Sequence, residues 1–235
     1  MSKLSNEELR EQFDDDVDRF SDETTGQSTA VDATLVFEML DATLPRLLPQ
    51  AERICDIGCG AGNFAIRIAR LYRGIGVTLI DLSRQMLDRA VSRLEANRFV
   101  VEKTIQEDIL HVSLPEEHFD IVTAAASLHH LRSRDDFLKV YRHIYTSLRP
   151  EGVFWMSDLI RHEIDGVETV QKQRYADFLI ALKDRPFQEE VFRLIDAGDT
   201  PETLMFHMAA LRDAGFRSVD IVHKNMVFAT VIARR

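Results

Sequence analysis

The feature that most constrains this chain is a short apolar run followed at once by three closely spaced glycines. Residues 53–56 form a predicted strand, Gly58, Gly60 and Gly62 follow it, and a helical pattern begins at residue 63. Glycine lacks a Cβ and tolerates positive φ, so such a turn lets a ligand approach the backbone closely. Ligands of open α/β sheets bind outside the carboxyl ends of the strands. The segment therefore predicts the first strand, turn and helix of a ligand-binding α/β sheet.

Strands and helices alternate through much of the chain. Strands are predicted at residues 53–56, 77–81, 100–106, 119–124 and 152–157, and helices at 63–71, 83–95 and 134–148. This alternation predicts a parallel sheet with helices on both faces. A helix at 201–214 then precedes two strands at 217–223 and 226–233, which Lys224 and Asn225 join as a two-residue hairpin connection. An antiparallel hairpin is therefore expected to complete the sheet.

Two segments depart from this alternation. A polar helical stretch at about 5–21 predicts an N-terminal helical cap over residues 1–30, and residues 31–235 form the main domain. That domain opens with a predicted helix at 31–48, closed by Pro45 and Pro49. Residues at about 160–199 are helical in pattern with few strand signals, and they predict an insertion over the carboxyl edge of the sheet.

Three acidic residues each follow a predicted strand. The Asp56 carboxylate ends the first strand and is placed to orient an ammonium group of a ligand. Asp81, 19 residues beyond Gly62, is placed to accept both hydroxyls of a ribose. Asp108 can accept a hydrogen bond from an adenine amine, with Ile109 packed on the ring. A glycine turn alone also fits a simple tight turn, and Asp81 or Asp108 alone also fits a helix start, but the three in chain order, each after a strand, favour a nucleoside site.

These segments resemble the motifs of class I methyltransferases: 56–62 (DIGCGAG), 79–83 (LIDLS) with Met86, 107–109 (EDI), and 119–122 (FDIV) with 128–131 (LHHL). The resemblance implies a Rossmann-like sheet of seven strands and S-adenosylmethionine as cofactor, with Gly58 and Gly60 along its methionine part. The predicted cofactor-binding residues are Asp56, Gly58, Gly60, Gly62, Asp81, Leu82, Met86, Asp108, Ile109 and Ala124. The expected activity is methyl transfer to a small-molecule acceptor.

The whole chain is also similar to carboxy-S-adenosylmethionine synthases, which act in the modification of the tRNA wobble uridine. The likeness rests on Phe13 and Asp14, on the helical segment after the fifth strand, and on residues 207–216 (HMAALRDAGF). Those enzymes modify the cofactor itself and use an arginine to hold the added carboxylate. That arginine falls at Ala210 here, so methyl transfer is the favoured interpretation and a synthase-like reaction is the alternative.

Candidate catalytic residues follow the fourth and fifth strands. They are His130, placed ahead of His129, and Asp158; a general base is needed only where the acceptor must lose a proton. Packing or capping roles for all three are the structural alternative. In the helical insertion, Tyr175 is a candidate wall of an acceptor pocket, and Arg161 and Arg174 are candidates to hold an acidic acceptor. The aromatic residues there also fit the buried face of a lid helix.

Composition narrows the classes of partner. A formal net charge of −10 disfavours nucleic acid, because binding to phosphates requires a basic face; a tRNA methyltransferase would need an Arg/Lys patch at the cleft. No apolar run reaches the roughly 18 residues of a membrane span, and the polar N-terminus predicts a cytoplasmic protein. Cys55 and Cys59 lack the His cluster of a metal site. A non-catalytic cofactor-binding module remains an alternative, and the final hairpin leaves a homodimer open.

Overall fold

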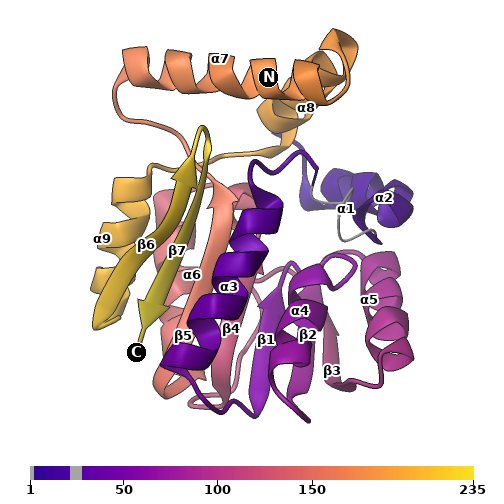
Figure 1. Ribbon diagram of the computed structural model, residues 1–235, viewed down its shortest axis with the longest axis vertical. Helices are drawn as coiled ribbons and strands as arrows, with labels where there is room; N and C mark the ends of the chain where they lie inside the picture. The colour runs from indigo at the N-terminus through magenta and orange to yellow at the C-terminus, as the bar shows by residue number, and fades with distance from the viewer. Residues whose placement is uncertain (1–2, 22–27) are drawn as a thin grey trace.

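The computed structural model describes residues 3–21 and 28–235, and its centre is a sheet of seven strands (Figure 1). The strands are β1 (Arg53–Ile57), β2 (Gly76–Asp81), β3 (Val100–Gln106), β4 (Phe119–Ala125), β5 (Leu148–Leu159), β6 (Ser218–Asn225) and β7 (Phe228–Arg234). Their order is β3-β2-β1-β4-β5-β7-β6, parallel except where β7 pairs with β5 and β6. The predicted α/β fold class, with its Rossmann-like, mostly parallel sheet and terminal hairpin, is confirmed.

Helices cover both faces of the sheet because successive strand residues point to opposite sides. Phe154 and Trp155 on β5 are both fully buried, yet they belong to different apolar clusters. Trp155 packs with α3 (Ala33–Leu47), α4 (Asn63–Leu71) and α5 (Arg84–Ala96). Phe154 packs with α6 (Arg134–Ser147) and α9 (Leu204–Ala214). The two-layer core fixes the sheet, so the loops at the carboxyl ends of the strands have a rigid base.

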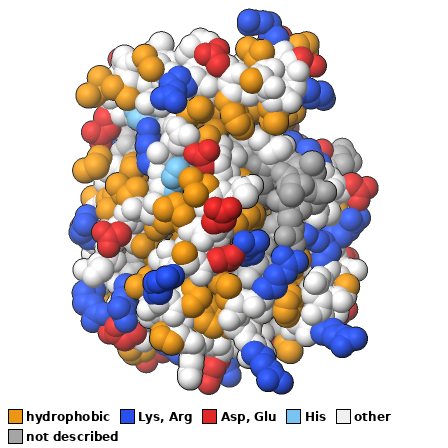
Figure 2. Space-filling model, in the orientation of Figure 1, with side chains coloured by type: hydrophobic (Ala, Val, Ile, Leu, Met, Phe, Trp, Pro, Cys, Tyr) orange, Lys and Arg blue, Asp and Glu red, His pale blue; other side chains and the backbone are white. Residues whose placement is uncertain are grey.

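Two further helices lie across the carboxyl edge of the sheet. They are α7 (Asp165–Leu182), drawn along the top of Figure 1, and α8 (Arg185–Gly198). They pack on β5 and on the hairpin turn through a third cluster that includes Leu159, Tyr175, Leu179, Val191 and Val227. Figure 2 shows hydrophobic side chains gathered where this layer meets the body of the molecule. A helical segment is therefore present where the insertion was expected.

The N-terminal segment contributes two short helices, α1 (Asn6–Asp15) and α2 (Val17–Ser21), rather than the single helix predicted at 5–21. Ser5 and Glu8 form a reciprocal capping box that begins α1. Phe13, Val17 and Phe20 pack on Ala61 and Met86, so both helices lie against the glycine turn. The domain division near residue 30 stays a prediction, and residues 1–2 and 22–27 of the predicted cap lie outside the described residues.

Two boundary predictions are wrong for identifiable reasons. Pro45 lies inside α3 instead of closing the helix, since a proline in the last turn forfeits only one backbone hydrogen bond. Lys224 and Asn225 belong to β6, and the hairpin turns at Met226 and Val227. The strand is extended because the Asn225 amide donates to an Asp32 carboxylate oxygen at 2.8 Å, which ties the strand end to the start of α3.

Candidate active site

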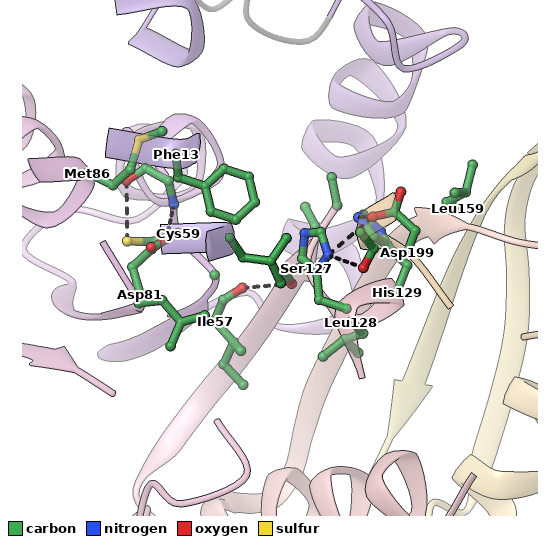
Figure 3. A pocket seen from close by; sticks show the side chains of 18 of the residues that line it. Phe13, Ile57, Cys59, Asp81, Met86, Ser127, Leu128, His129, Leu159 and Asp199 are labelled. Atoms are coloured by element: carbon green, nitrogen blue, oxygen red, sulfur yellow. Dashed lines mark hydrogen bonds and ion pairs between the residues drawn. The ribbon is translucent and has the colours of Figure 1, made fainter. Parts of the chain in front are cut away.

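A cavity of about 360 Å³ lies at the carboxyl ends of β1, β2 and β4, beneath α1 and α8 (Figure 3). Of the predicted cofactor residues, Asp56, Gly58, Gly60, Asp81, Leu82, Met86, Asp108 and Ile109 line it. The other two do not. Gly62 begins α4 and faces Ala90 of α5, whereas Ala124 is fully buried within β4. The sheet therefore gathers most of the predicted nucleoside-site residues around one space.

The glycine turn adopts the conformation that its composition requires. Gly58 and Gly60 have φ of +61° and +48°, in the left-handed region that favours glycine. A Cβ at Gly58 would lie 2.3 Å from the Ser127 Cβ, so this position is closed by the protein itself. A Cβ at Gly60 would meet no atom within 4 Å. The open space above Gly60, beside Asp81, fits a ligand that approaches the backbone.

Asp56 and Asp81 are buried carboxylates at the ends of β1 and β2. The Asp81 oxygens accept hydrogen bonds from the Gly60 N–H at 2.8 Å and the Ser83 N–H at 2.9 Å, and lone pairs remain for ribose hydroxyls. Burial raises the pKa of Asp81, although these N–H groups oppose the shift. Burial also raises the pKa of Asp56 to about 7, against the Thr123 hydroxyl that donates to it at 2.7 Å. Asp81 therefore fits the ribose hydroxyls of S-adenosylmethionine, and Asp56 fits its ammonium group.

Asp108 has a partner that the sequence did not predict. The Asn6 side-chain amide of α1 donates to Asp108 Oδ2 at 2.6 Å, and the Leu110 N–H donates to Oδ1 at 2.9 Å. An NH₂ group therefore already contacts the carboxylate that was predicted to accept an adenine amine. The contact shows that this carboxylate suits an amine donor, and it brings α1 to the nucleoside end of the cavity.

His129 lies between two carboxylates. Its Nδ1 contacts an Asp158 oxygen. Its Nε2 lies 3.6 Å from Asp199 Oδ1, on the side that faces the cavity in Figure 3. Burial disfavours the charged ring, but the charges of Asp199 and Asp158 outweigh burial and raise the pKa of His129 to about 9. His129 is therefore an imidazolium at neutral pH, which links the ends of β4 and β5 to the end of α8.

His130, which also lines the cavity, has a different environment. Its Nδ1 lies 3.2 Å from Asp199 Oδ1 and 3.4 Å from the Gly198 carbonyl oxygen, and its ring packs edge-on against Phe13, 5.5 Å between centroids. Burial lowers the pKa of His130, and the positive charge of His129 lowers it further. The two neighbouring histidines therefore differ in charge at neutral pH.

Asp199 is the residue that sequence reasoning missed. It is the C-cap of α8 and lies 41 residues beyond Asp158 in the chain, so no local pattern connects it with the histidines. Asp158 itself does not line the cavity and is buried beneath it, where it also accepts the Leu128 N–H at 2.9 Å. Among the described residues, His129, His130 and Asp199 offer atoms within 4.8 Å of one another, a spacing that a metal ion would also accept.

The three predicted acceptor-binding residues are dispersed. Tyr175 of α7 lines the cavity, but its hydroxyl donates to the Thr29 carbonyl oxygen at 3.0 Å. Arg161 is outside the cavity and pairs with Glu202 at 2.9 Å, and Arg174 is not part of the lining either. Both arginines were expected to hold an acidic acceptor, and their positions do not support that role.

The chain is similar in sequence and in fold to known proteins that are named for reactions of S-adenosylmethionine. Residues 54–152 match the family described as a methyltransferase domain. A carboxy-S-adenosyl-L-methionine synthase of Nautilia profundicola is 26% identical over 242 residues, 98% of each chain. Human N-acetylserotonin methyltransferase, solved with S-adenosylmethionine, superposes with a TM-score of 0.62 at 18% identity, covering 98% of this chain and 56% of that one. The [4+2]-cyclase SpnF gives 0.69 at 15% identity, covering 100% and 97%.

The last comparison shows that this fold also occurs in a protein named for another reaction, so the fold leaves the chemistry open. The matched domain and the lining of the cavity agree on the cofactor. Residues 54–152 therefore form a methyltransferase domain, in a fold that is shared with S-adenosylmethionine-dependent methyltransferases, and S-adenosylmethionine is the cofactor of such a domain.

Proposed function

We propose that this enzyme transfers the methyl group of S-adenosylmethionine to a small-molecule acceptor and that His130 takes the proton the acceptor loses. One observation carries the proposal: His130 Nδ1 faces two hydrogen-bond acceptors, Asp199 Oδ1 at 3.2 Å and the Gly198 carbonyl oxygen at 3.4 Å. A ring nitrogen that faces two acceptors holds the proton, so Nε2 of the neutral ring carries a lone pair. The lowered pKa of His130 keeps this form at neutral pH.

The roles of the remaining residues follow from their positions. Bound S-adenosylmethionine supplies an electrophilic methyl group on a positively charged sulfur. Asp56 holds the ammonium group, Asp81 the ribose hydroxyls and Asp108 the adenine amine, which orients the cofactor along the strand ends. His129 positions Asp199 by charge, and Asp199 in turn orients His130. The enzyme thus acts chiefly by placing the acceptor beside a base.

A synthase-like reaction on the cofactor is the second candidate, because similarity to the Nautilia synthase extends over nearly the whole chain. The cavity argues against it. Ala210, where the synthases' arginine falls, is buried in α9 and does not line the cavity. The two arginines that do line the described cavity, Arg19 and Arg132, already have partners.

Calorimetric titration with S-adenosylmethionine, S-adenosylhomocysteine and carboxy-S-adenosylmethionine separates these candidates. Micromolar affinity for the first two, with no preference for the carboxylated form, is the result expected of a methyltransferase. A clear preference for the carboxylated form, or formation of that compound with prephenate as carboxylate donor, would establish the second candidate instead.

The role of His130 is tested with an acceptor identified by screening for S-adenosylhomocysteine formation. His130→Asn should lower kcat at least about a hundredfold while cofactor affinity is kept. His118→Asn is the matched control, since His118 precedes β4 at the opposite edge of the sheet. Activity should survive dialysis against EDTA. Loss of activity with EDTA and its return with a divalent cation would assign the histidine cluster to a metal instead of a base.

A further inference from the structure

The cavity extends beyond the glycine turn to a region beneath α7 and α8, which we call the apolar half. Six side chains from α1, β5, α7 and α8 form its walls: Leu9, Phe13, Leu159, Tyr175, Val191 and Ile195. Figure 3 shows Phe13 near the glycine turn and Leu159 at the far side, with His129 and Asp199 between them. The apolar half therefore lies next to the histidines, and Phe13 stands between it and the glycine turn, in contact with both His130 and the cluster of Ala61 and Met86.

The polar group of Tyr175 is turned away from this space. Its hydroxyl donates to the Thr29 carbonyl oxygen at 3.0 Å, and its ring stacks near Phe178 and Phe192, 6.2 and 5.8 Å between centroids. The part of Tyr175 that lines the cavity is therefore the apolar surface of its ring. Aromatic ligands pack favourably on such surfaces.

The three cations in the described lining, Arg19, Arg132 and the His129 imidazolium, all have partners, and His129 lies between Asp158 and Asp199. Arg132 donates from Nη1 to the Gly198 carbonyl at 2.6 Å and from Nη2 to the Leu4 carbonyl at 2.7 Å. Arg19 pairs with Asp16 at 3.0 Å and lies over the Phe20 ring. A carboxylate buried in the apolar half would be unpaired and would also face Asp199, which makes its binding costly.

We infer that the acceptor is an uncharged, phenol-like aromatic molecule that lies in the apolar half with its hydroxyl at His130. The inference rests on the proposed methyl transfer and adds the class of substrate. In the reaction the phenol oxygen bonds the methyl carbon, the carbon–sulfur bond breaks, and its electron pair stays on sulfur to give S-adenosylhomocysteine. The phenol proton passes to His130 Nε2. A phenol, with an unperturbed pKa near 10, is within reach of such a base.

Three related probes test the acceptor class: 2-naphthol, 3-hydroxy-2-naphthoate and 2-naphthylmethylamine, each assayed for S-adenosylhomocysteine formation. The neutral phenol should show a kcat/KM at least tenfold above either charged probe. Equal or better turnover of a charged probe would overturn the inference but leave methyl transfer intact. If none is methylated, although S-adenosylmethionine binds, while an unrelated acceptor is methylated, the acceptor class alone fails. If no acceptor of any class is methylated, the proposed function fails as well.

A pair of leucine substitutions tests the location. Leu194→Arg on α8 places a cation in the lining, and it should shift the kcat/KM ratio at least tenfold toward 3-hydroxy-2-naphthoate. Leu182→Arg, at the exposed end of α7, should leave the ratio unchanged. Calorimetry with S-adenosylmethionine confirms that both variants fold. An unchanged ratio in the folded Leu194→Arg variant would place acceptor binding elsewhere.

Discussion

Asn6 donates a hydrogen bond of 2.6 Å to Asp108, which lies 102 residues further along the chain. The amide contacts the carboxylate that we assign to the adenine amine, so the two donors compete. Asn6→Ala should therefore tighten S-adenosylmethionine binding by about threefold to tenfold, and Asp108→Asn should weaken it by about tenfold. Calorimetry measures both. Weaker binding in Asn6→Ala would mean that the amide joins the cofactor site instead of competing for it.

The two glycines of the β1–α4 turn that line the cavity should respond differently to alanine. Gly58→Ala places a Cβ 2.3 Å from Ser127 at positive φ, so we expect a loss of about 3 kcal/mol or more in unfolding free energy. Gly60→Ala meets open space and should cost only about 1–2 kcal/mol for its positive φ. The added methyl instead obstructs the ligand, so cofactor affinity should fall. Denaturant titration measures the unfolding free energy of each variant, and calorimetry measures its affinity for S-adenosylmethionine. Equal destabilisation of the two variants would contradict the geometry.

Cofactor binding should depend on pH through Asp56. Its pKa is raised to about 7 by burial, and only the ionised form attracts an ammonium group. Affinity for S-adenosylmethionine should therefore rise about tenfold between pH 5.5 and 7, with release of a proton on binding. Calorimetry in buffers of different ionisation enthalpy detects that proton. Asp56→Asn should bind weakly and without this pH dependence; a slope that persists in this variant would assign the effect to another group.

The imidazolium of His129 should contribute to stability in a defined pH range. Its folded pKa of about 9 exceeds the usual value near 6.5, so the contribution is complete below pH 6.5 and is lost as pH rises through 9. The loss should approach about 3 kcal/mol at most. His129→Asn keeps a donor for Asp158 but cannot ionise. The wild-type excess over this variant should shrink between pH 6.5 and 9, and a constant difference would show that His129 is neutral in the folded protein.

The sequence predicted best what depends on local pattern. The alternation of strands and helices identified the sheet, and the predicted cofactor residues line one cavity apart from Gly62 and Ala124. Those two residues lie in the predicted segments but do not face the ligand. The Cα of Gly62 faces Ala90 of α5, and the Ala124 side chain is buried in the core. A motif places a residue near a ligand, whereas side-chain direction depends on the packing of the whole segment.

The sequence did not predict what depends on distant packing. Asp199 reaches the histidines only because α8 lies across the sheet edge, and Asn6 reaches Asp108 only because α1 packs beside α5 at the same edge. The hairpin turn moved to Met226 because Asn225 is bound by Asp32, far away in the chain. Arg161 looked available for a substrate, but Glu202, 41 residues later, already pairs with it.

Asp199, as the C-cap of α8, belongs to the covering layer, whereas His129 and His130 lie in a short 3-10 helix (Leu128–His130) that follows β4 of the sheet. The catalytic pair of His130 and Asp199 is therefore assembled from two separate layers of the protein. Any outward displacement of α8 separates Asp199 from His130 and leaves the imidazole free to change tautomer. An uncovered active site would thus hold a reactive methyl donor but no oriented base. Such an arrangement ties turnover to full enclosure of the acceptor, and it predicts ordered kinetics in which products leave only after the catalytic cluster has come apart.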